Sequence, residues 1–338
     1  MFGKVEVEER IWRDARQSYR RVFCALIGVA PRGKSRALKR VLSDFGAEHA
    51  FAQAAARVKE HYGFELHGSA VRAATLETAQ RARKKLESKY ALPYRVLPAV
   101  GRERVVAEAD GTMVCTVKPG RRKDKRPREW KEMRLAAAQA QGSCEAVYAA
   151  TFESVDDAGR RWAHCARDVG WGLKSQIHVV ADGAEWIRLQ GNTVFGDQHH
   201  MLCDFYHVSE YLAAASKTAS PSRSERWRKT QQRRLKRGAS DSVIAELATH
   251  REPPDTPAEA APVTNAHRYL TNRRDCLDYK SALEQELPIG SGLIESGHRH
   301  VLQARLKKAG TSWLPETAEA MAQLRVIRAN HQWSTLWN

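Results

Sequence analysis

Three carboxylates in this 338-residue chain stand where a reaction centre could form. Asp110 and Asp182 each close a short, mainly apolar run, RVVAEAD and IHVVAD, and each is followed directly by glycine. Glu295 lies in the first turn of a helix that is predicted to begin after the loop PIGSG. Ligands in α/β sheets gather at the carboxyl ends of strands, so the two aspartates are expected to meet there, with Glu295 close by.

This set of side chains suits divalent metal ions. Three anions placed close together repel one another and need counter-charge. Mg²⁺ prefers oxygen ligands and supplies that charge, and Mn²⁺ is the expected substitute. Two such ions about 4 Å apart serve phosphodiester displacement, with Asp110 bridging both and Asp182 and Glu295 holding one each. The alternative is structural, because Asp-Gly is a common turn pair and each aspartate could simply cap a turn.

The helix that carries Glu295 is predicted to be amphipathic. The face expected to pack against a sheet consists of Ile294, Gly297, Val301 and Ala304. Glu295 and His298 fall on a neighbouring face. A glycine inside a helix costs ~1 kcal/mol relative to alanine, so Gly297 indicates close backbone packing or a functional need.

The overall charge favours a polyanionic partner. Lys and Arg number 56 against 39 Asp and Glu, which gives a formal net charge of +17. Nucleic acid is therefore the expected partner. No run of about 18 apolar residues predicts a membrane span, and the first residues show no apolar signal core, so we expect a cytoplasmic protein. The six cysteines include no CxxC pair and are expected to be reduced.

Basic side chains in four regions are candidate DNA contacts. They are Arg72 in a helix over 70–86, Arg121, Arg122 and Lys123 in a basic loop over 118–131, Arg228, Lys229, Arg233 and Arg234 in a basic helix over 223–237, and Arg299, Arg305, Lys307 and Lys308 on the Glu295 helix. Trp313 could stack on an unpaired base, although tryptophans are more often core residues.

The elements around these residues predict two kinds of structure. Residues 4–28, 35–45, 51–58 and 70–86 are expected to be helical, and a basic helix after a short turn is the helix-turn-helix pattern. Strands are expected over 104–110, 146–152, 177–181 and 201–206, with helices over 155–169 and 208–217, which together indicate an α/β sheet. A further helix is expected over 315–330.

This pattern divides the chain into four consecutive regions. Residues 1–95 form a helical, DNA-binding region, and 100–217 form the first part of a catalytic core. Residues 218–288 form a helical insertion, and 289–338 return to the core with the Glu295 helix and a C-terminal helix. The proline-containing linker near residue 95 predicts that the first region can be removed without unfolding the core.

Four stretches resemble the DDE-type insertion-sequence transposases of the ISKra group, relatives of the Mutator-like elements. They are ADGTMV around Asp110, VVADGAEWI around Asp182, CDFYHVSEYL, and PIGSGLIESGHRHVLQARLKKAGTSW around Glu295. The resemblance spans roughly residues 45–338. It implies an RNase H-like mixed-sheet core interrupted by a helical insertion, with Asp110, Asp182 and Glu295 as the metal-binding triad.

The same resemblance implies further roles and partners. Asp204 and His207 match a (C/D)xxH motif of these elements, and we assign supporting roles to them and to His298. The expected partners are double-stranded DNA at the element ends and at the target, and further copies of the chain on that DNA, in the bacterial nucleoid. His207 could equally be a histidine held by hydrogen bonds at a strand–helix junction.

Two other functions fit parts of the same pattern. A helix-turn-helix regulator derived from a transposase would keep the basic surfaces without the chemistry, although the presence of all three carboxylates argues against it. An RNase H-like nuclease would cut DNA without transferring a strand. Metal-dependent nicking separates the first from a transposase, and joined products separate the second.

Overall fold

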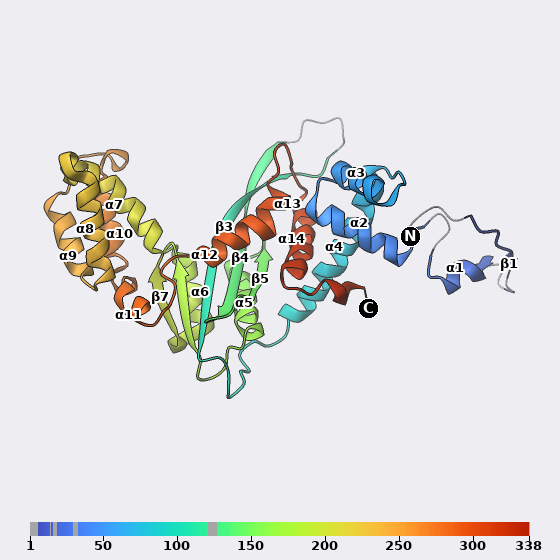
Figure 1. Cartoon of the computed structure of the whole chain (residues 1–338), viewed down its shortest axis with the longest axis horizontal. Coiled ribbons are helices and arrows are strands. Elements are labelled where there is room, and N and C mark those ends of the chain that lie inside the picture. The colour runs from blue at the N-terminus through green and yellow to red at the C-terminus, as the bar shows by residue number, and fades with distance from the viewer. Residues whose placement is uncertain (1–5, 14, 16–18, 30–32, 121–126, 338) are drawn as a thin grey trace. The chain divides into compact units, whose positions relative to one another are not determined.

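The computed structural model describes residues 6–13, 15, 19–29, 33–120 and 127–337. It confirms an α/β protein with a five-stranded sheet in the order β5-β4-β3-β6-β7. Figure 1 shows this sheet with helices beside it. The strands are β3 (Arg104–Val117), β4 (Arg128–Ala140), β5 (Ala146–Thr151), β6 (Gln176–Ala181) and β7 (His199–Cys203).

The sheet is mixed, because β4 and β5 are antiparallel while β3, β6 and β7 run parallel. The parallel strands are joined through helices, as parallel pairs require. α5 (Val155–Asp168) follows β5, α6 (Glu185–Phe195) and the 3₁₀ turn Gly196–Gln198 follow β6, and α7 (Phe205–Ala219) follows β7. From Ile177 to Ala181, β6 is buried throughout, as its unbroken apolar run predicts.

Two strands differ from their predicted limits. β3 runs on past Asp110 to Val117, so Asp110 lies inside the strand rather than at its end. Gly111 does not take up the left-handed conformation of a turn, so the chain continues straight. β7 ends at Cys203, because Asp204 accepts hydrogen bonds from the backbone of Tyr206 and His207 and thereby caps α7.

The chain forms two compact units that do not follow its order. Unit 1 comprises residues 1–91, 114–131 and 299–338, and unit 2 comprises residues 92–113 and 132–298. The predicted division used four consecutive ranges. Unit 1 is discontinuous in sequence because its last long helix, α14 (Pro315–Ala329), packs against α4 (Gly68–Tyr90), which comes from the first third of the chain.

Unit 1 is mainly helical. α4 also packs against α2 (Arg36–Glu48) and α3 (Phe51–Tyr62), and η6 (Trp333–Leu336) closes the chain. The helix predicted over 4–28 is wrong for the described residues, where β1 (Ile11–Arg13) pairs with β2 (Tyr19–Arg21) ahead of α1 (Val22–Leu26). No residue of α1 is buried, so no packing stabilises a longer helix there.

Unit 2 contains the predicted helical insertion, seen beside α7 in Figure 1. Its helices are α8 (Ser224–Lys236), α9 (Ser240–Thr249), α10 (Pro262–Thr271) and α11 (Tyr279–Glu284), with 3₁₀ turns at Pro221–Arg223, Ala258–Ala260 and Arg274–Cys276. α7 packs against α8 and α10. Leu235, Val243, Leu247 and Leu270 are completely buried in their shared core, which makes the insertion a folded bundle.

The helix with Glu295 changes its winding part-way along. α12 (Gly292–Gly297) is followed by the π-helical stretch η5 (His298–Gln303) and then by α13 (Ala304–Leu306). A π turn takes in an extra residue, so a face extrapolated at 3.6 residues per turn goes out of phase. Ala304, predicted to face inward, is exposed, and Arg305 and Leu306 are buried instead.

Two further expectations concern membranes and cysteines. None of the helices in the described part of the chain combines the length and apolar character needed to cross a bilayer. All six cysteines are free thiols, as their scattered positions predict.

Candidate active site

The parallel strands of unit 2 bring three aspartates to one level of the sheet. The β3–β6 pairing ends two residues before Asp110 and Asp182, and the β6–β7 pairing ends one residue before Asp182 and Asp204. The ladder continues into this level, since the backbone N–H of Asp204 donates to the carbonyl of Ala181 at 2.7 Å. Extending both registers sets the three aspartates side by side on neighbouring strands.

A fourth carboxylate, Glu108, joins this level to the helix that carries Glu295. Glu108 lies two residues before Asp110, so the two side chains share a face of the sheet. Its Oε2 accepts a hydrogen bond from the backbone N–H of Ile294 at 2.7 Å. Since Glu295 follows Ile294, this bond fixes the Glu295 turn over the strand that carries Asp110.

Gly297 allows the same turn to lie flat on the sheet. A Cβ at this position would stand 2.7 Å from Cε1 of Tyr148 and 2.9 Å from Cδ2 of Leu135. Both distances are shorter than real Cβ contacts, so any other residue at this position would have to displace the side chains of Tyr148 and Leu135. The prediction that Gly297 marks close packing is therefore confirmed.

The surroundings of Glu108 are strongly unfavourable to negative charge. Its side chain is 1% exposed. Burial raises the pKa of Glu108 to about 8, with the negative charges of Asp204 and Glu295 adding to the effect and the hydrogen bond from Ile294 opposing it. The influence of both charges identifies Asp204 and Glu295 as neighbours of Glu108. Glu108 was not among the predicted site residues, although a glutamate two positions before Asp110 in an apolar strand was a usable signal.

His298 approaches Asp110 directly. Its Nε2 lies 3.1 Å from Oδ2 of Asp110. Within the described residues neither ring nitrogen has a directed hydrogen-bond partner, so the contact is close enough for an ion pair but poorly aligned for a hydrogen bond. Asp110 is half-buried, and its Oδ1 accepts from the backbone N–H of Gly111 at 2.7 Å. The supporting role assigned to His298 therefore has a physical basis in this contact.

Asp204 accepts hydrogen bonds from two segments, the first turn of α7 and the residue before α12. One oxygen, Oδ1, caps α7 by accepting from Tyr206 and His207 at 2.6 and 3.1 Å. The other, Oδ2, accepts from the backbone N–H of Ser291 at 2.8 Å and from its hydroxyl. Because Ser291 immediately precedes α12, Asp204 ties the start of the Glu295 helix to the end of β7.

Asp182 is exposed and belongs to a turn held by the insertion. Its Oδ1 accepts from the backbone N–H of Ala184 at 2.9 Å, which is the turn-capping arrangement of the structural alternative. The Tyr269 hydroxyl on α10 donates to the carbonyl of Asp182 at 2.5 Å, and the Arg273 guanidinium donates to that of Gly183 at 2.7 Å. Among the described residues, the second carboxylate oxygen of Asp182 accepts no hydrogen bond.

The ring of His207 lies in an aromatic cluster. Its ring packs edge-on to Tyr211 and Tyr269, with centroids 5.4 and 5.6 Å apart. Its Nδ1 is 3.7 Å from Oε2 of Glu210. Since Tyr269 also donates a hydrogen bond to the carbonyl of Asp182, His207 is linked to the Asp182 turn through one intermediate side chain.

The candidate DNA contacts separate into distinct groups. Exposed side chains are Arg72, Lys229, Arg233, Arg299 and Lys307, and Lys308 is half-buried. Arg228 is paired with Glu225 at 2.7 Å, and Arg234 with Glu246 at 3.4 Å. Arg121, Arg122 and Lys123 lie outside the described residues.

Arg305 and Trp313 lie in the core of unit 1, not on its surface. Arg305 is 2% exposed, and its guanidinium stands 4.7 Å from the ring centroid of Phe51 and 4.8 Å from that of Trp313. The indole N–H of Trp313 donates to the carbonyl of Leu306 at 3.1 Å. The π turn rotates Arg305 inward, so neither side chain is placed to contact DNA directly.

The carboxylates of the candidate site are of a type that binds hard divalent cations, although they do not surround a common point. The structure describes no group of three or more His, Cys, Asp or Glu side chains arranged to hold a metal ion. Carboxylates nevertheless gather on one face of the sheet, and their charges act on Glu108. Carboxylate oxygens of this kind are the ligands that Mg²⁺ and Mn²⁺ take.

The chain was also compared with known proteins. The model of an uncharacterised protein family, UPF0236, matches residues 2–335. No curated protein matches the chain.

Proposed function

The chain belongs to the uncharacterised protein family UPF0236, and we propose that it is a DNA transposase. It would cut DNA at the ends of its own insertion sequence and join the freed 3′-OH strand to target DNA. One observation carries the proposal: the register of the parallel strands β3 and β6, extended by two residues, brings Asp110 level with Asp182, and Glu108 accepts a hydrogen bond from the turn that holds Glu295.

In this proposal Asp110, Asp182 and Glu295 hold two Mg²⁺ ions, for which Mn²⁺ substitutes. The bound ions would activate the attacking oxygen and stabilise the leaving one during phosphodiester displacement. Support comes from the crowding of negative charge around Glu108, since a site of this kind is stabilised by cations. The net charge of +17 supports a polyanionic substrate.

The remaining side chains of the site would position these three. His298 would orient the carboxylate of Asp110, which it contacts at 3.1 Å. Asp204 would hold the start of α12 through Ser291. Tyr269 and Arg273 would hold the turn that presents Asp182, so the insertion would contribute to the site as well as to DNA binding.

Substitution of Asp182 by cysteine tests the proposal. Sulfur is a poor ligand for Mg²⁺ and a better one for Mn²⁺, so Asp182→Cys should lose orders of magnitude of strand cleavage in Mg²⁺ and regain part of it in Mn²⁺. The assay is nicking of DNA that carries the element ends, followed by analysis for joined products. DNA binding should persist in both metals.

Asp182→Ala is the matched control, and Mn²⁺ should rescue it less. A purely turn-capping Asp182 would instead lower thermal stability in both variants, with no metal-specific recovery. Full cleavage by Asp182→Cys in Mg²⁺ would show that this side chain does not bind the metal. Nicking without joined products would favour an RNase H-like nuclease.

A further inference from the structure

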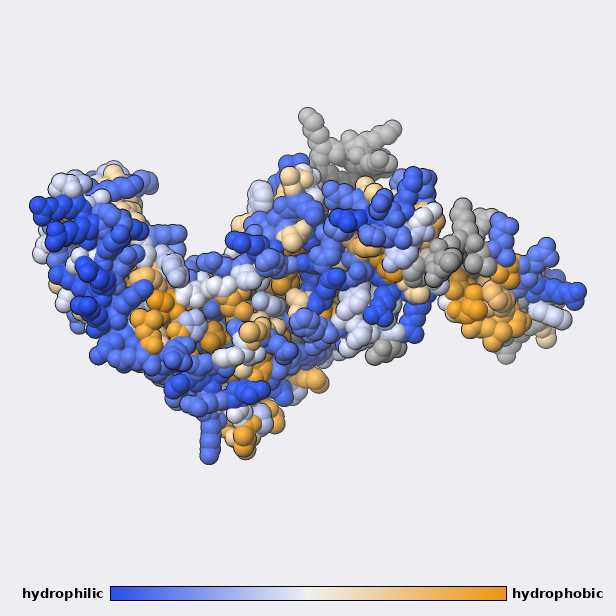
Figure 2. Space-filling view, in the orientation of Figure 1, coloured by the Kyte–Doolittle hydropathy of each residue, from blue (hydrophilic) through white to orange (hydrophobic). Residues whose placement is uncertain are grey.

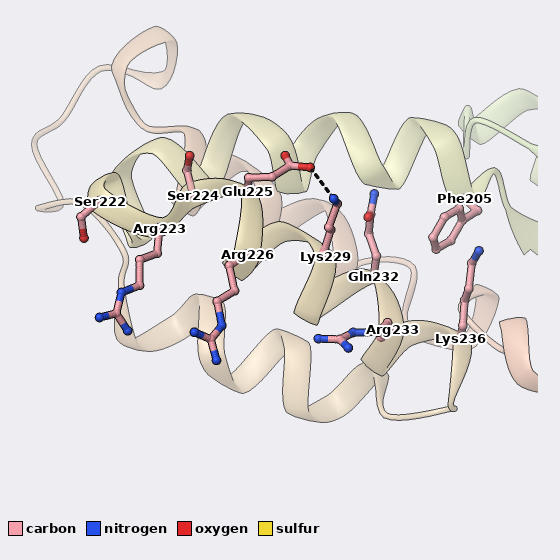
Figure 3. Close-up of a pocket in the computed structure, with 10 residues that line it drawn as sticks. All are labelled: Phe205, Ser222, Arg223, Ser224, Glu225, Arg226, Lys229, Gln232, Arg233 and Lys236. Atoms are coloured by element: carbon pink, nitrogen blue, oxygen red, sulfur yellow. Dashed lines mark ion pairs between the residues drawn. The ribbon is translucent and has the colours of Figure 1, made fainter.

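The helical insertion carries a groove in which five of the ten lining residues are cations. The groove has a volume of about 800 Å³ and lies along α8 and the 3₁₀ turn before it. Its basic side chains are Arg223, Arg226, Lys229, Arg233 and Lys236, all of them exposed. Figure 3 shows the guanidinium groups of Arg223, Arg226 and Arg233 directed to one side of the helix. Glu225 is the one acidic side chain among the residues that line this groove.

Packing of α8 fixes which face bears the groove. Gln231 and Leu235 are buried, and the indole N–H of Trp227 donates to Glu246 of α9 at 3.3 Å. These three residues are spaced four apart and therefore form one stripe that faces the bundle core. The groove-lining cations are left on the outer side, where Figure 2 shows a largely hydrophilic surface at the α8–α9 end of the insertion.

Most of the cations in the groove are not neutralised by carboxylates. Among the described residues, Arg223, Arg226, Arg233 and Lys236 have no ion-pair partner, and Lys229 is 3.2 Å from Glu225. Arginines elsewhere in the insertion differ. Arg228 pairs with Glu225 and Arg234 with Glu246, and Arg274 pairs with Asp241 at 2.6 Å. The bundle thus separates a paired set from an unpaired set that shares one groove.

The lining of the groove offers no exposed aromatic side chain on which a base could stack. Phe205 lines one end, but it is 5% exposed, and the ammonium of Lys236 lies over its ring at 4.5 Å. A row of cations from Arg223 to Lys236 extends over about 20 Å of helix. One strand of duplex DNA presents a phosphate every ~3.4 Å along its axis, so the row is long enough to contact several phosphates.

We propose that this groove binds the sugar–phosphate backbone of duplex DNA without regard to sequence. The inference rests on the proposed function for the choice of DNA and names the surface of the insertion that would hold it. It differs from the sequence-based set, because Arg228 and Arg234 drop out and Arg223, Arg226 and Lys236 enter.

Two triple variants with equal loss of charge test the groove. The first is Arg223→Gln, Arg226→Gln and Arg233→Gln, and the matched control is Arg228→Gln, Arg234→Gln and Arg274→Gln. Affinity for random-sequence duplex DNA is measured against salt concentration in EDTA, with circular dichroism and thermal unfolding to verify that both proteins are folded. Each phosphate contact contributes about 0.9 to the slope of log K against log salt, so the first variant should lose about 2 to 3 from that slope.

The control should keep a slope within about 1 of the wild type, since its arginines are already paired. Equal losses in the two variants would mean that net charge alone matters, and no loss in the first would leave the groove without a role in binding. Tighter binding of duplex RNA than of duplex DNA would also overturn the proposal. Because EDTA prevents metal-dependent chemistry, failure here is independent of the cleavage assay, which can fail while groove-dependent binding persists.

Discussion

At the scale of single residues, the acidic site depends on side chains that hold others in place. Glu108 and Asp204 each use a carboxylate oxygen to accept a backbone N–H from the segment Ser291–Ile294. Both are buried, so neither is replaced by water at low cost. Glu108 and Asp204 therefore position the exposed Glu295, although neither is itself a predicted metal ligand.

The raised pKa of Glu108 predicts a pH-dependent stability. Because the folded pKa of about 8 lies above the usual 4.5, the folded state binds the proton more tightly. The stabilisation is complete below pH 4.5 and is lost as the pH rises to about 8. Glu108→Gln keeps a neutral acceptor for the backbone N–H of Ile294. The free energy of unfolding of this variant should therefore fall less over this pH range than that of the wild type, and the two decreases should differ by a few kcal/mol at most. Denaturant unfolding in EDTA between pH 5 and about 9 measures the difference.

Glu108→Ala provides the control for the hydrogen bond itself. It leaves the backbone N–H of Ile294 buried without its acceptor, which should cost about 1–3 kcal/mol relative to Glu108→Gln at every pH. Parallel stability curves for the wild type and Glu108→Gln would contradict the shifted titration.

At the scale of elements, α12 combines a close contact with the sheet and a change of winding one residue later. Gly297 brings the helix against β4 and β5, and η5 begins at His298, whose ring reaches Asp110. π-helical turns are frequent at functional sites, where they redirect a side chain. In this protein the turn coincides with the residue that contacts the first aspartate.

Replacing Gly297 should therefore disturb the site through packing. Gly297→Ala places a Cβ within 3.0 Å of Tyr148 and Leu135, and overpacking of this kind typically costs about 1–3 kcal/mol. The Glu295 turn would move away from the sheet, so cleavage should fall along with the thermal midpoint. Gly292→Ala in the same helix meets nothing within 4 Å and should be neutral or slightly stabilising. Equal behaviour of the two variants would show that the contact at Gly297 is not limiting.

The elements also show where sequence patterns suffice and where they do not. The apolar run of β6 and the amphipathic helices α5 and α14 were predicted to within a residue or so, because burial imposes their periodicity. β4 was not predicted. Its segment Met133–Ala140 is rich in alanine and has no strand pattern, and its place between β3 and β5 decides its conformation.

The candidate site follows the same division. Which residues are acidic, and that Asp182 follows a buried strand, could be read from the sequence. Asp110 inside a strand, Glu108 beneath α12 and the inward turn of Arg305 could not, since each depends on tertiary pairing or on a π turn. Local periodicity carries no record of either.

At the scale of the whole molecule, the N-terminal helices and the C-terminal helix share one unit. Met321 and Leu324 of α14 are completely buried, in a unit that also contains α2, α3 and α4. Arg325 and Arg328 add ion pairs to Glu48 and Asp44. The first region is thus part of a common core, and the separability expected from the proline-containing linker has no support in this packing.

Deleting residues 1–95 should consequently leave an uncovered α14. The truncated protein should aggregate or unfold at a lower temperature than the full chain, because apolar residues of α14 lose their partners in α4. Size-exclusion chromatography and thermal unfolding provide the measurement. Deletion of residues 1–28 alone is the control and should leave the midpoint unchanged, since α1 buries no residue. If the 96–338 fragment were monomeric and had the thermal midpoint of the full chain, the first region would be a separable domain after all.

The partnership of α4 and α14 also sets an order of events during synthesis. α4 leaves the ribosome long before its partner exists, and the segment from Ala91 to Leu314 takes on the order of 10–50 s to translate at usual rates. For that interval the part of α4 that packs against α14 has no permanent cover. The last step in the folding of unit 1 therefore waits for α14, whereas unit 2 has all of its residues once His298 has been translated.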